Sequence, residues 1–399
     1  MSEPARRVVL LGTHGQYNIG DELLLEVFLA QLGTRHRYVV NSYDPAFTGA
    51  QLRGRYDIDL VDTRHGRRDL LRHLRRCDRL VFAGGSVVKE LYASTGRNRY
   101  STLAMILATV TWAKLVARVP VAMYNVGVGP LATRTGRLLA RLVLAQVDEL
   151  SVRDDRSHRT CLSFGRAAGG LVAGTDAVFS VTPDWLRGGP SRPPAAAQRP
   201  RGADGVPRPV RVALNLNYDI ENRANWDLFL DRLAGGLAQL HERHPIELHT
   251  LPMQEGFKAH DDVEVLDEFI GRVRPIPAHR HTPRTHHDVA AVLERCDLLV
   301  SERLHAIIMA AILGVPPLVL AYDVKVRELA AVLGLGEYTI DINRPFKAAD
   351  LAGRLGALLE ERTAVAAAVM ARSEQLRARA LAGFASARTW VAGSPAAAL

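Results

Sequence analysis

Short apolar segments alternate with longer helix-like segments along most of the chain, and this alternation constrains the fold more than any other feature. Parallel strands need a crossover between them, usually a helix, whereas antiparallel strands can be joined by short hairpins. The alternation therefore predicts an α/β fold with parallel sheets. The predicted strands are residues 7–11, 37–42, 79–83, 120–126 and 149–153 in the first half, and 210–216, 246–252, 297–300, 317–322 and 337–341 in the second.

Two domains are expected, because 399 residues exceed what one hydrophobic core usually holds. Residues 186–209 separate the two series of strands and are too rich in Pro, Gly and Arg to build a core. A short repeat supports two related halves, since Arg-Cys-Asp-x-Leu-Val occurs at residues 76–81 and again at 295–300. We predict an N-terminal Rossmann-like domain at 1–185, a linker at 186–209, a C-terminal Rossmann-like domain at 210–365, and C-terminal helices at 366–399 that pack on the N-terminal domain.

The net charge of +9 raises the question of nucleic-acid binding. The 46 arginines and five lysines are scattered, however, and the sequence has no basic run with interleaved aromatic residues. This distribution favours a solvated basic surface and small anionic substrates over a nucleic acid. Cys77, Cys161 and Cys296 lie far apart without a CxxC pair, which suits a reducing compartment and argues against structural zinc.

The N-terminal residues lack the long apolar run of a signal peptide. The apolar-leaning run LAMILATVTWA at residues 103–113 is shorter than the ~20 residues that span a bilayer. We therefore expect a cytoplasmic protein without a transmembrane segment and with at most peripheral membrane contact.

Ligands bind beyond the carboxyl ends of the strands in folds of this class, so the residues after each strand indicate the site. The first strand leads into GTHGQYNIGDE, where Asn18 and Gly20 lie at the start of a helix whose N-terminus can receive an anion. Glu22 is interpreted as a cap of this helix. Asp21 is open to two interpretations, a helix cap and a functional carboxylate.

Two further strand ends of the first half carry polar residues. The third strand ends in AGGS, where Gly85 and Ser86 allow a ligand close to the backbone. The fifth ends in SVRDDRS, where Arg153 either pairs with a neighbouring aspartate or binds a ligand.

In the second half, the segment SERLH follows a buried strand and places Arg303 and His305 in one loop. Lys325 follows the next strand, in a chain that otherwise uses arginine. Two cations and an imidazole at neighbouring strand ends suit a small ligand with two anionic groups.

Taken in order, the motifs GTHGQYNIGDE, AGGS, SVRDDRS, TDAVFSV, SERLHA and YDVKV resemble those of the polysaccharide pyruvyl transferases. The resemblance spans residues 8–335, and Ser-x-Arg-Leu-His is its most specific element. It implies a GT-B-like fold, with two Rossmann-like domains facing a cleft. It also implies transfer of the enolpyruvyl carbons of phosphoenolpyruvate onto two sugar hydroxyls as a ketal, or onto one.

The resemblance also implies roles for the residues that match these motifs. Arg153, Arg303 and Lys325 would bind the carboxylate and phosphate of phosphoenolpyruvate. His305 would either deliver a proton to the methylene carbon, since an imidazole has a reference pKa near ~6.5, or only bind phosphate. Asp21 would be a base for the acceptor. Neither a metal nor a cofactor is expected beyond phosphoenolpyruvate as co-substrate. The residues expected to line the acceptor side are Asn18, Gly20, Gly85 and Ser86.

Two departures from the family pattern concern the acceptor. His14 stands where members often have an aromatic residue, and LNLNYD at residues 214–219 lacks an arginine that is sometimes found there. A free, lipid-linked or polymeric sugar-containing acceptor is compatible with this pattern. Two alternative functions remain open, because fold does not fix function. They are a GT-B-type glycosyltransferase or epimerase acting on a nucleotide sugar, and a non-catalytic anion-binding homologue.

Overall fold

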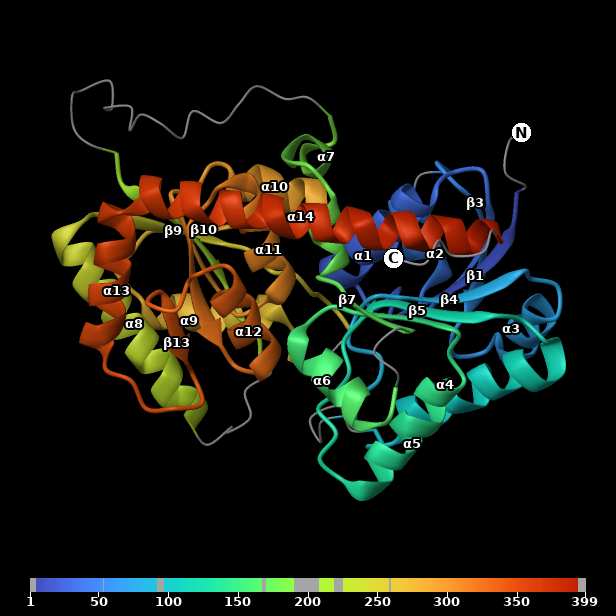
Figure 1. Ribbon diagram of the computed structural model, residues 1–399. Helices are drawn as coiled ribbons and strands as arrows, with labels where there is room; N and C mark the ends of the chain where they lie inside the picture. The colour runs from blue at the N-terminus through green and yellow to red at the C-terminus, as the bar shows by residue number, and fades with distance from the viewer. Residues whose placement is uncertain are drawn as a thin grey trace. The chain divides into compact units, whose positions relative to one another are not determined.

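The computed structural model describes residues 5–52, 54–91, 97–166, 170–189, 208–218, 225–257 and 260–393, so most of the expected linker at 186–209 lies outside the described residues. The chain divides into two compact units (Figure 1). The first contains Met1–Ser180 and Leu376–Leu399, and the second contains Val181–Gln375. Each unit has its own parallel sheet, so the predicted α/β class with two Rossmann-like domains is confirmed.

Within the described residues, the sheet of the first unit has seven parallel strands in the order β3-β2-β1-β4-β5-β6-β7. This is the strand order of a Rossmann fold with one strand added, and the chain reverses direction across the sheet between β1 and β4. The strands are β1 (Arg7–Leu11), β2 (Arg37–Ser42), β3 (Asp57–Asp62), β4 (Arg79–Ala83), β5 (Val121–Val126), β6 (Glu149–Val152) and β7 (Leu171–Ala173). The helical segments are α1 (Ile19–Leu32), α2 (Pro45–Leu52), α3 (Arg67–Leu74), α4 (Ser101–Trp112), η2 (Ala113–Ala117), α5 (Arg134–Ala145), α6 (Asp155–Ser163) and η4 (Ala177–Ser180).

The sheet of the second unit has six parallel strands among the described residues, in the order β10-β9-β8-β11-β12-β13. Here the reversal falls between β8 and β11. The strands are β8 (Val210–Asn215), β9 (Ile246–Thr250), β10 (Ala278–Arg280), β11 (Leu298–Ser301), β12 (Pro317–Ala321) and β13 (Thr339–Asp341). The helices are α7 (Pro183–Arg187), α8 (Trp226–Arg243), α9 (Asp262–Arg272), α10 (His286–Leu293), α11 (Leu304–Leu313), α12 (Val324–Val332), α13 (Ala348–Glu360) and α14 (Arg362–Ala392).

The core of each unit lies between its sheet and the covering helices. All four residues of β11 are buried, and so is every residue of α11 from Ala306 to Leu313. A helix that is apolar all round is stable only when it is buried on all sides. This burial explains why polar residues in this part of the chain are confined to the connection between β11 and α11.

The short sequence repeat occupies the same place in both sheets, because it leads into β4 in one unit and β11 in the other. The carboxylate of Asp78 accepts a hydrogen bond from the backbone N–H of Arg7 at 2.8 Å, and that of Asp297 accepts one from Arg211 at 2.9 Å. The N–H of each aspartate donates back to the carbonyl of the same arginine. The two halves therefore share a local structure as well as a sequence pattern.

The C-terminal part of the chain forms α14, one continuous helix, whose residues from Leu376 onward belong to the first unit. Phe384 of this helix packs edge-on against Phe28 of α1, with ring centroids 5.1 Å apart. Both phenylalanines are completely buried, so the end of the chain contributes to the core of the first unit.

Candidate functional site

Residues from three neighbouring strand ends meet in the first unit. Ser86 follows β4, Gly127 follows β5, and Arg153 follows β6. Nη2 of Arg153 donates a hydrogen bond to Oγ of Ser86 at 2.7 Å. A Cβ atom on Gly127 would lie 3.1 Å from this guanidinium and 3.2 Å from the Ser86 hydroxyl, so a side chain there would crowd the contact and displace its members by a few tenths of an ångström. The structure thus brings together two residues that the sequence analysis had singled out separately.

Two carboxylates flank the guanidinium of Arg153. Its Nε atom lies 3.4 Å from Asp154, and its Nη1 atom lies 3.7 Å from Asp176. The side chains of Arg153 and Asp176 are both 7% exposed. Pairing with Asp154 was one of the two interpretations of Arg153, whereas Asp176, from the TDAVFSV motif, is a partner that sequence reasoning missed. Arg153 is therefore a nearly buried cation with a fixed orientation.

The loop between β1 and α1 ends at Asn18, which caps the helix. Oδ1 of Asn18 accepts a hydrogen bond from the N–H of Gly20 at 2.9 Å, and its carbonyl accepts one from Asp21 at 3.1 Å. The N-cap role therefore belongs to Asn18, while Asp21 lies half-buried in the first turn. Earlier in the loop, Gly15 has a φ of +75°, and a Cβ atom there would lie 2.1 Å from the hydroxyl of Ser42.

Two buried ionisable residues lie at the same loop. Oε1 of Glu22 accepts a hydrogen bond from the N–H of Gly15 at 2.6 Å, so Glu22 holds the loop in addition to lying in the first turn of α1. Burial raises the pKa of Glu22 to about 7. His14 is 1% exposed, and burial lowers the pKa of its imidazole to about 4, so the ring is neutral. His14 therefore serves as a buried neutral ring at the position where family members often carry an aromatic residue.

In the second unit, Asn215 at the end of β8 fixes the backbone of the SERLH segment. Its Oδ1 atom accepts hydrogen bonds from Oγ of Ser301 at 3.0 Å and from the N–H of Arg303 at 3.1 Å. Asn215 is completely buried and lies directly opposite Ser301 in the pairing of β8 with β11. A side chain from the LNLNYD segment thus sets the path of the chain between β11 and α11.

Arg303 forms an ion pair with Asp262, the first residue of α9, which sequence reasoning missed. Nε of Arg303 lies 3.1 Å from Oδ2 of Asp262, and Nη2 contacts Oδ1. Nη2 also donates to Oε1 of Gln254 at 3.2 Å. The side chain of Asp262 is 1% exposed and that of Arg303 is 12% exposed. A buried carboxylate therefore orients this guanidinium and offsets part of its charge.

His305 and Lys325 occupy the first turns of two successive helices. His305 is the second residue of α11 and is half-buried as a residue, while its Nε2 atom is shielded from solvent. Lys325 is the second residue of α12, and its Nζ atom lies 3.2 Å from Asp323 with 30% of the side chain exposed. Because β11 and β12 are neighbouring parallel strands, the helices that follow them start at the same edge of the sheet. Their N-terminal N–H groups favour an anion at that edge.

Glu247, His249 and His279 form a group in the second unit that has the donor atoms for a metal ion. Their ligand atoms all lie within 4.8 Å of one another. Nε2 of His249 lies 3.3 Å from Glu247, whose carboxylate also pairs with Arg211 at 2.7 Å. Two imidazoles and a carboxylate suit zinc, although no metal was expected from the sequence. The sequence pattern does not reveal the group, because its members meet only through the pairing of β9 with β10.

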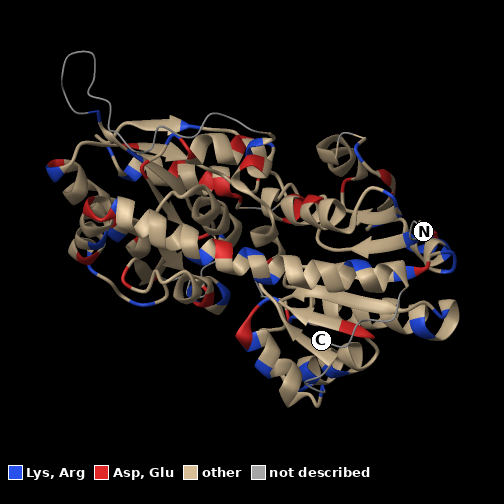
Figure 2. Ribbon diagram, turned by 45° about the horizontal axis from the view of Figure 1, so that its top comes forward, with Lys and Arg blue, Asp and Glu red and all other residues tan. Residues whose placement is uncertain are grey.

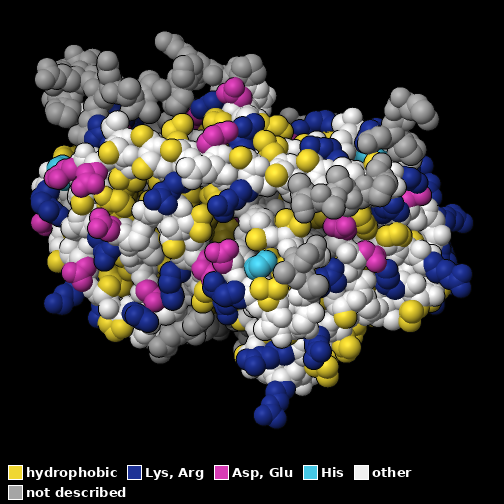
Figure 3. All heavy atoms as spheres, in the orientation of Figure 1, with side chains coloured by type: hydrophobic (Ala, Val, Ile, Leu, Met, Phe, Trp, Pro, Cys, Tyr) yellow, Lys and Arg dark blue, Asp and Glu magenta, His cyan; other side chains and the backbone are white. Residues whose placement is uncertain are grey.

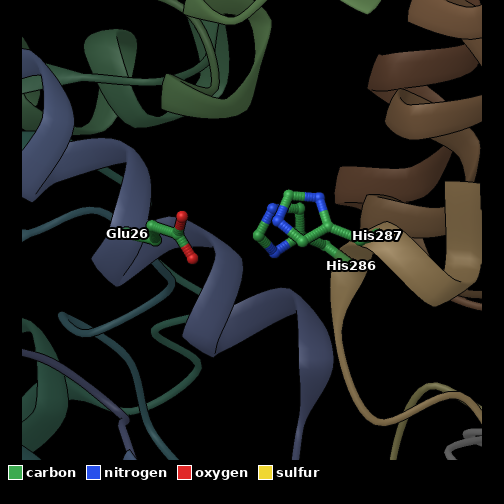
Figure 4. Close-up of side chains that lie close together, drawn as sticks. All are labelled: Glu26, His286 and His287. Atoms are coloured by element: carbon green, nitrogen blue, oxygen red, sulfur yellow. The ribbon is translucent and has the colours of Figure 1, made fainter. Parts of the chain in front are cut away.

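Figure 4 shows Glu26 of α1 together with His286 and His287 of α10. Glu26 belongs to the first unit, where it pairs with Arg55 at 2.6 Å. The two histidines belong to the second unit. There, His286 stacks on Trp185 with ring centroids 4.9 Å apart, and Nδ1 of His287 bonds a carbonyl of α7 at 2.8 Å. Each of the three side chains has partners within its own unit, and we assign them no metal.

Solved structures with two Rossmann-like units place this chain in the GT-B-like fold class. A glycosyltransferase from Rickettsia africae is similar with a TM-score of 0.64 and 10% identity, over 98% of this chain and 100% of that one. A UDP-GlcNAc 2-epimerase from Neisseria meningitidis, bound to UDP-GlcNAc, is similar with a TM-score of 0.57 and 10% identity, over 94% and 99% of the two chains. At these identities the likeness concerns the fold alone. No curated protein sequence matches the chain.

The family is established by a separate comparison, in which the model of the polysaccharide pyruvyl transferases matches residues 18–324. The chain belongs to the polysaccharide pyruvyl transferase family. The matched region includes Arg153, Arg303 and His305, and it ends one residue before Lys325. Membership makes the protein a sugar-modifying transferase.

Proposed function

We propose that this protein transfers a pyruvyl group from phosphoenolpyruvate to two hydroxyls of a sugar-containing acceptor and forms a ketal. The observation that carries the proposal is the placement of SERLH at the carboxyl end of β11. It puts Arg303 and His305 at the start of α11, at the edge of the sheet where Lys325 begins α12. This edge combines cations, helix N-termini and one titratable imidazole, which are the groups that a dianionic donor needs.

In this proposal the donor is held through its two anionic groups. Arg303, oriented by Asp262, and Lys325, which is partly exposed, bind the phosphate and carboxylate in the second unit. Arg153 has the same role in the first unit, where Ser86 and Asp176 fix its direction. Charge-assisted hydrogen bonds of this kind are shorter and roughly twice as strong as neutral ones.

The chemistry requires one proton at carbon and two new carbon–oxygen bonds. His305 gives a proton to the methylene carbon of phosphoenolpyruvate, which becomes a methyl group, while C2 becomes electrophilic. The first acceptor hydroxyl adds to C2 and loses its proton, with Asp21 as the base for this step. The second hydroxyl then forms its bond to C2 as the bond from C2 to the phosphate oxygen breaks, and phosphate leaves with the second hydroxyl proton. Asn18, Gly20, Gly85 and Ser86 line the acceptor side.

Mass spectrometry of acceptors tests the proposal directly. The full chain is incubated with phosphoenolpyruvate and a panel of free, lipid-linked and polymeric sugars. We expect one acceptor to gain the mass of a pyruvyl ketal, with one inorganic phosphate released per ketal formed. Conversion of UDP-GlcNAc or another nucleotide sugar, without any use of phosphoenolpyruvate, would instead assign the chain to the glycosyltransferase or epimerase alternative. Binding of phosphoenolpyruvate without turnover of any acceptor would support the non-catalytic alternative.

A further inference from the structure

Exposed apolar side chains are concentrated on one part of the first unit. Five of the eleven large hydrophobic residues that are exposed within the described part of the chain lie on α4, η2 and α5. We call the surface of these three segments the α4–α5 surface. Its exposed apolar residues are Met105, Leu115, Val116, Leu138 and Leu142, with Leu115 the most exposed at 72%.

α4 accounts for the apolar character of this surface. The helix contains no charged residue, and eight of its twelve residues are apolar. One face of it, with Leu103, Ile106 and Val110, is buried in the core of the first unit. The opposite face is equally apolar, yet Ala104, Met105 and Ala108 are exposed. A helix that is apolar all round is normally covered on all sides, so the exposed half of α4 lacks a cover within the described residues.

The three segments also form a shallow apolar hollow. It has a volume of about 400 Å³ and is lined by residues of α4, η2 and α5, among them Leu107, Trp112, Leu115 and Leu139. In Figure 3, hydrophobic side chains lie next to Lys and Arg over the region that Figure 1 labels α5. The exposed apolar residues therefore lie on three segments that share one apolar hollow, and such a concentration on one part of a protein often marks a binding surface.

The charge of this part of the chain is also exceptional. Over most of the molecule, basic and acidic residues are interspersed (Figure 2). Residues 91–147, in contrast, contain no Asp or Glu and seven Arg or Lys, so this segment carries most of the net charge of +9. Some of this charge is offset by acids outside the segment, since Lys114 pairs with Asp148 at 2.7 Å. The surroundings of the apolar surface are nevertheless strongly basic.

On α5 the basic and apolar residues share one face of the helix. Arg134, Arg137, Leu138, Arg141 and Leu142 have the spacing i, i+3, i+4, i+7 and i+8, and all five are exposed. The opposite face is buried in the first unit. Exposed leucines beside arginines match the two neighbouring parts of a lipid interface, since phosphates and the boundary of the acyl chains are adjacent there.

We propose that the α4–α5 surface binds the surface of a membrane that contains anionic lipids. The exposed leucines, valine and methionine enter the boundary between headgroups and acyl chains, and the arginines contact lipid phosphates. A second copy of this chain fits less well, because it would place two arginine-rich faces against each other, and like charges across an interface are costly. Among the described residues no helix is long and apolar enough to cross a bilayer, so the contact is with the membrane surface.

Sedimentation with lipid vesicles tests this proposal. The full chain is mixed with vesicles of phosphatidylcholine alone, or of phosphatidylcholine with phosphatidylglycerol. We expect the protein to bind the anionic vesicles, and to bind the neutral vesicles at least about 10-fold more weakly. Replacing Leu115, Leu138 and Leu142 by Gln should reduce vesicle binding at least 10-fold, and each of Arg134→Gln, Arg137→Gln and Arg141→Gln should reduce it about five-fold. All six side chains are exposed, so the variants should fold normally.

A matched control uses an exposed apolar residue elsewhere. Leu228 on α8 is 44% exposed, close to the 45% of Leu142, and Leu228→Gln should leave vesicle binding unchanged. Equal loss of binding in the control, or no binding of the parent protein to anionic vesicles, would overturn the proposal. It would also be overturned if the parent protein were a dimer in solution that the leucine variants dissociate, since a second copy would then cover this surface. The surface contains none of the proposed catalytic or donor-binding residues, so the outcome is independent of the proposed reaction.

Discussion

Asp262 and Arg303, 41 residues apart in the sequence, form a nearly buried ion pair at the carboxyl end of the second sheet. The pair explains how an arginine is held almost out of solvent beside an apolar helix. It also means that the carboxylate, rather than the strand itself, determines where the guanidinium points.

Removal of this carboxylate should destabilise the protein strongly. Asp262→Ala leaves Arg303 as an uncompensated buried charge and takes an acceptor from the N–H of Met253. We expect the free energy of unfolding to fall by roughly 3–5 kcal/mol in urea denaturation. As a control, Asp231→Ala removes a 65% exposed carboxylate that pairs with Arg272, and it should cost less than about 1 kcal/mol. Similar losses in the two variants would show that burial does not determine the strength of the first pair.

Lys325 is the clearest test of donor binding, because its side chain is partly exposed and its partner Asp323 still accepts a hydrogen bond from the N–H of Val326 when the lysine is removed. Lys325→Ala should weaken the binding of phosphoenolpyruvate by about 10- to 150-fold, as expected for the loss of a charge-assisted hydrogen bond worth roughly 1.5–3 kcal/mol. Calorimetric titration with phosphoenolpyruvate measures this change. Lys347→Ala, at the start of α13, should bind the donor like the parent protein. An unchanged dissociation constant in Lys325→Ala would remove this residue from the donor site.

His305 should affect turnover more than binding. A proton transfer to carbon matters chiefly in the transition state, so His305→Ala should abolish ketal formation and leave donor binding within a few-fold of the parent. His305→Gln keeps a hydrogen-bonding group but no acid, and it should be equally inactive. Turnover is measured by ketal formation beside the titration with phosphoenolpyruvate. If the glutamine variant retained most of its turnover, His305 would be a phosphate ligand and the proton would come from another group.

Gly127 allows the contact between Arg153 and Ser86, so a single methyl group at this position should displace the guanidinium. Gly127→Ala is expected to lower kcat/KM at least about 10-fold through misplacement of Arg153. Gly383→Ala on α14 is the matched control, because a Cβ atom there meets no neighbouring atom. The control should keep full activity and gain about 0.5–1 kcal/mol of stability from the helix. Full activity in Gly127→Ala would mean that the position of Arg153 is not critical.

Glu22 should make the stability of the protein depend on pH. Its pKa is raised by burial from 4.5 to about 7, so the folded state keeps its proton while the unfolded state has lost it. The contribution of protonated Glu22 to the free energy of unfolding is therefore fully present below the unfolded pKa of 4.5 and is lost as pH rises through about 7. Glutamine cannot ionise, so Glu22→Gln does not lose this contribution. The free energy of unfolding of the variant minus that of the parent should therefore rise by on the order of 3 kcal/mol between pH 4.5 and about 7. Unfolding curves at a series of pH values measure the difference. The exposed Glu264→Gln should show no such trend, and a flat difference for Glu22→Gln would contradict the role of burial.

The scaffold could be predicted from the sequence because its central strands are apolar and separated by helices. The three strands that the apolar pattern missed, β3, β7 and β10, all lie at the edges of their sheets. β3 has the sequence DIDLVD, and β7 and β10 have only three residues each. An edge strand pairs on one side only and is partly exposed, so it needs neither length nor a continuous apolar run.

The candidate site was predictable only in part. Arg153, Arg303 and Lys325 follow apolar strands, and this position is visible in the sequence. Their orientation is not, because it depends on carboxylates from other segments. Asp262 begins a helix that follows β9, and Asp176 directly precedes the short helical segment η4 after β7. The burial of His14 and Glu22 was hidden for a similar reason, since both residues occur in a loop sequence that reads as polar.

The repeated hydrogen bonds of Asp78 and Asp297 also bear on the ancestry of the protein. An aspartate in the same short sequence makes the same hydrogen bonds in both sheets, which is the arrangement that tandem duplication of one ancestral segment produces. The two copies differ within the strand at Arg79 and Leu298, and they diverge completely toward its end, where one continues as FAGGS and the other as SERLH. In this history the shared half of the segment builds the scaffold, and the diverged half supplies the residues of the proposed site. One copy acquired glycines and a hydroxyl, and the other acquired a cation and an imidazole.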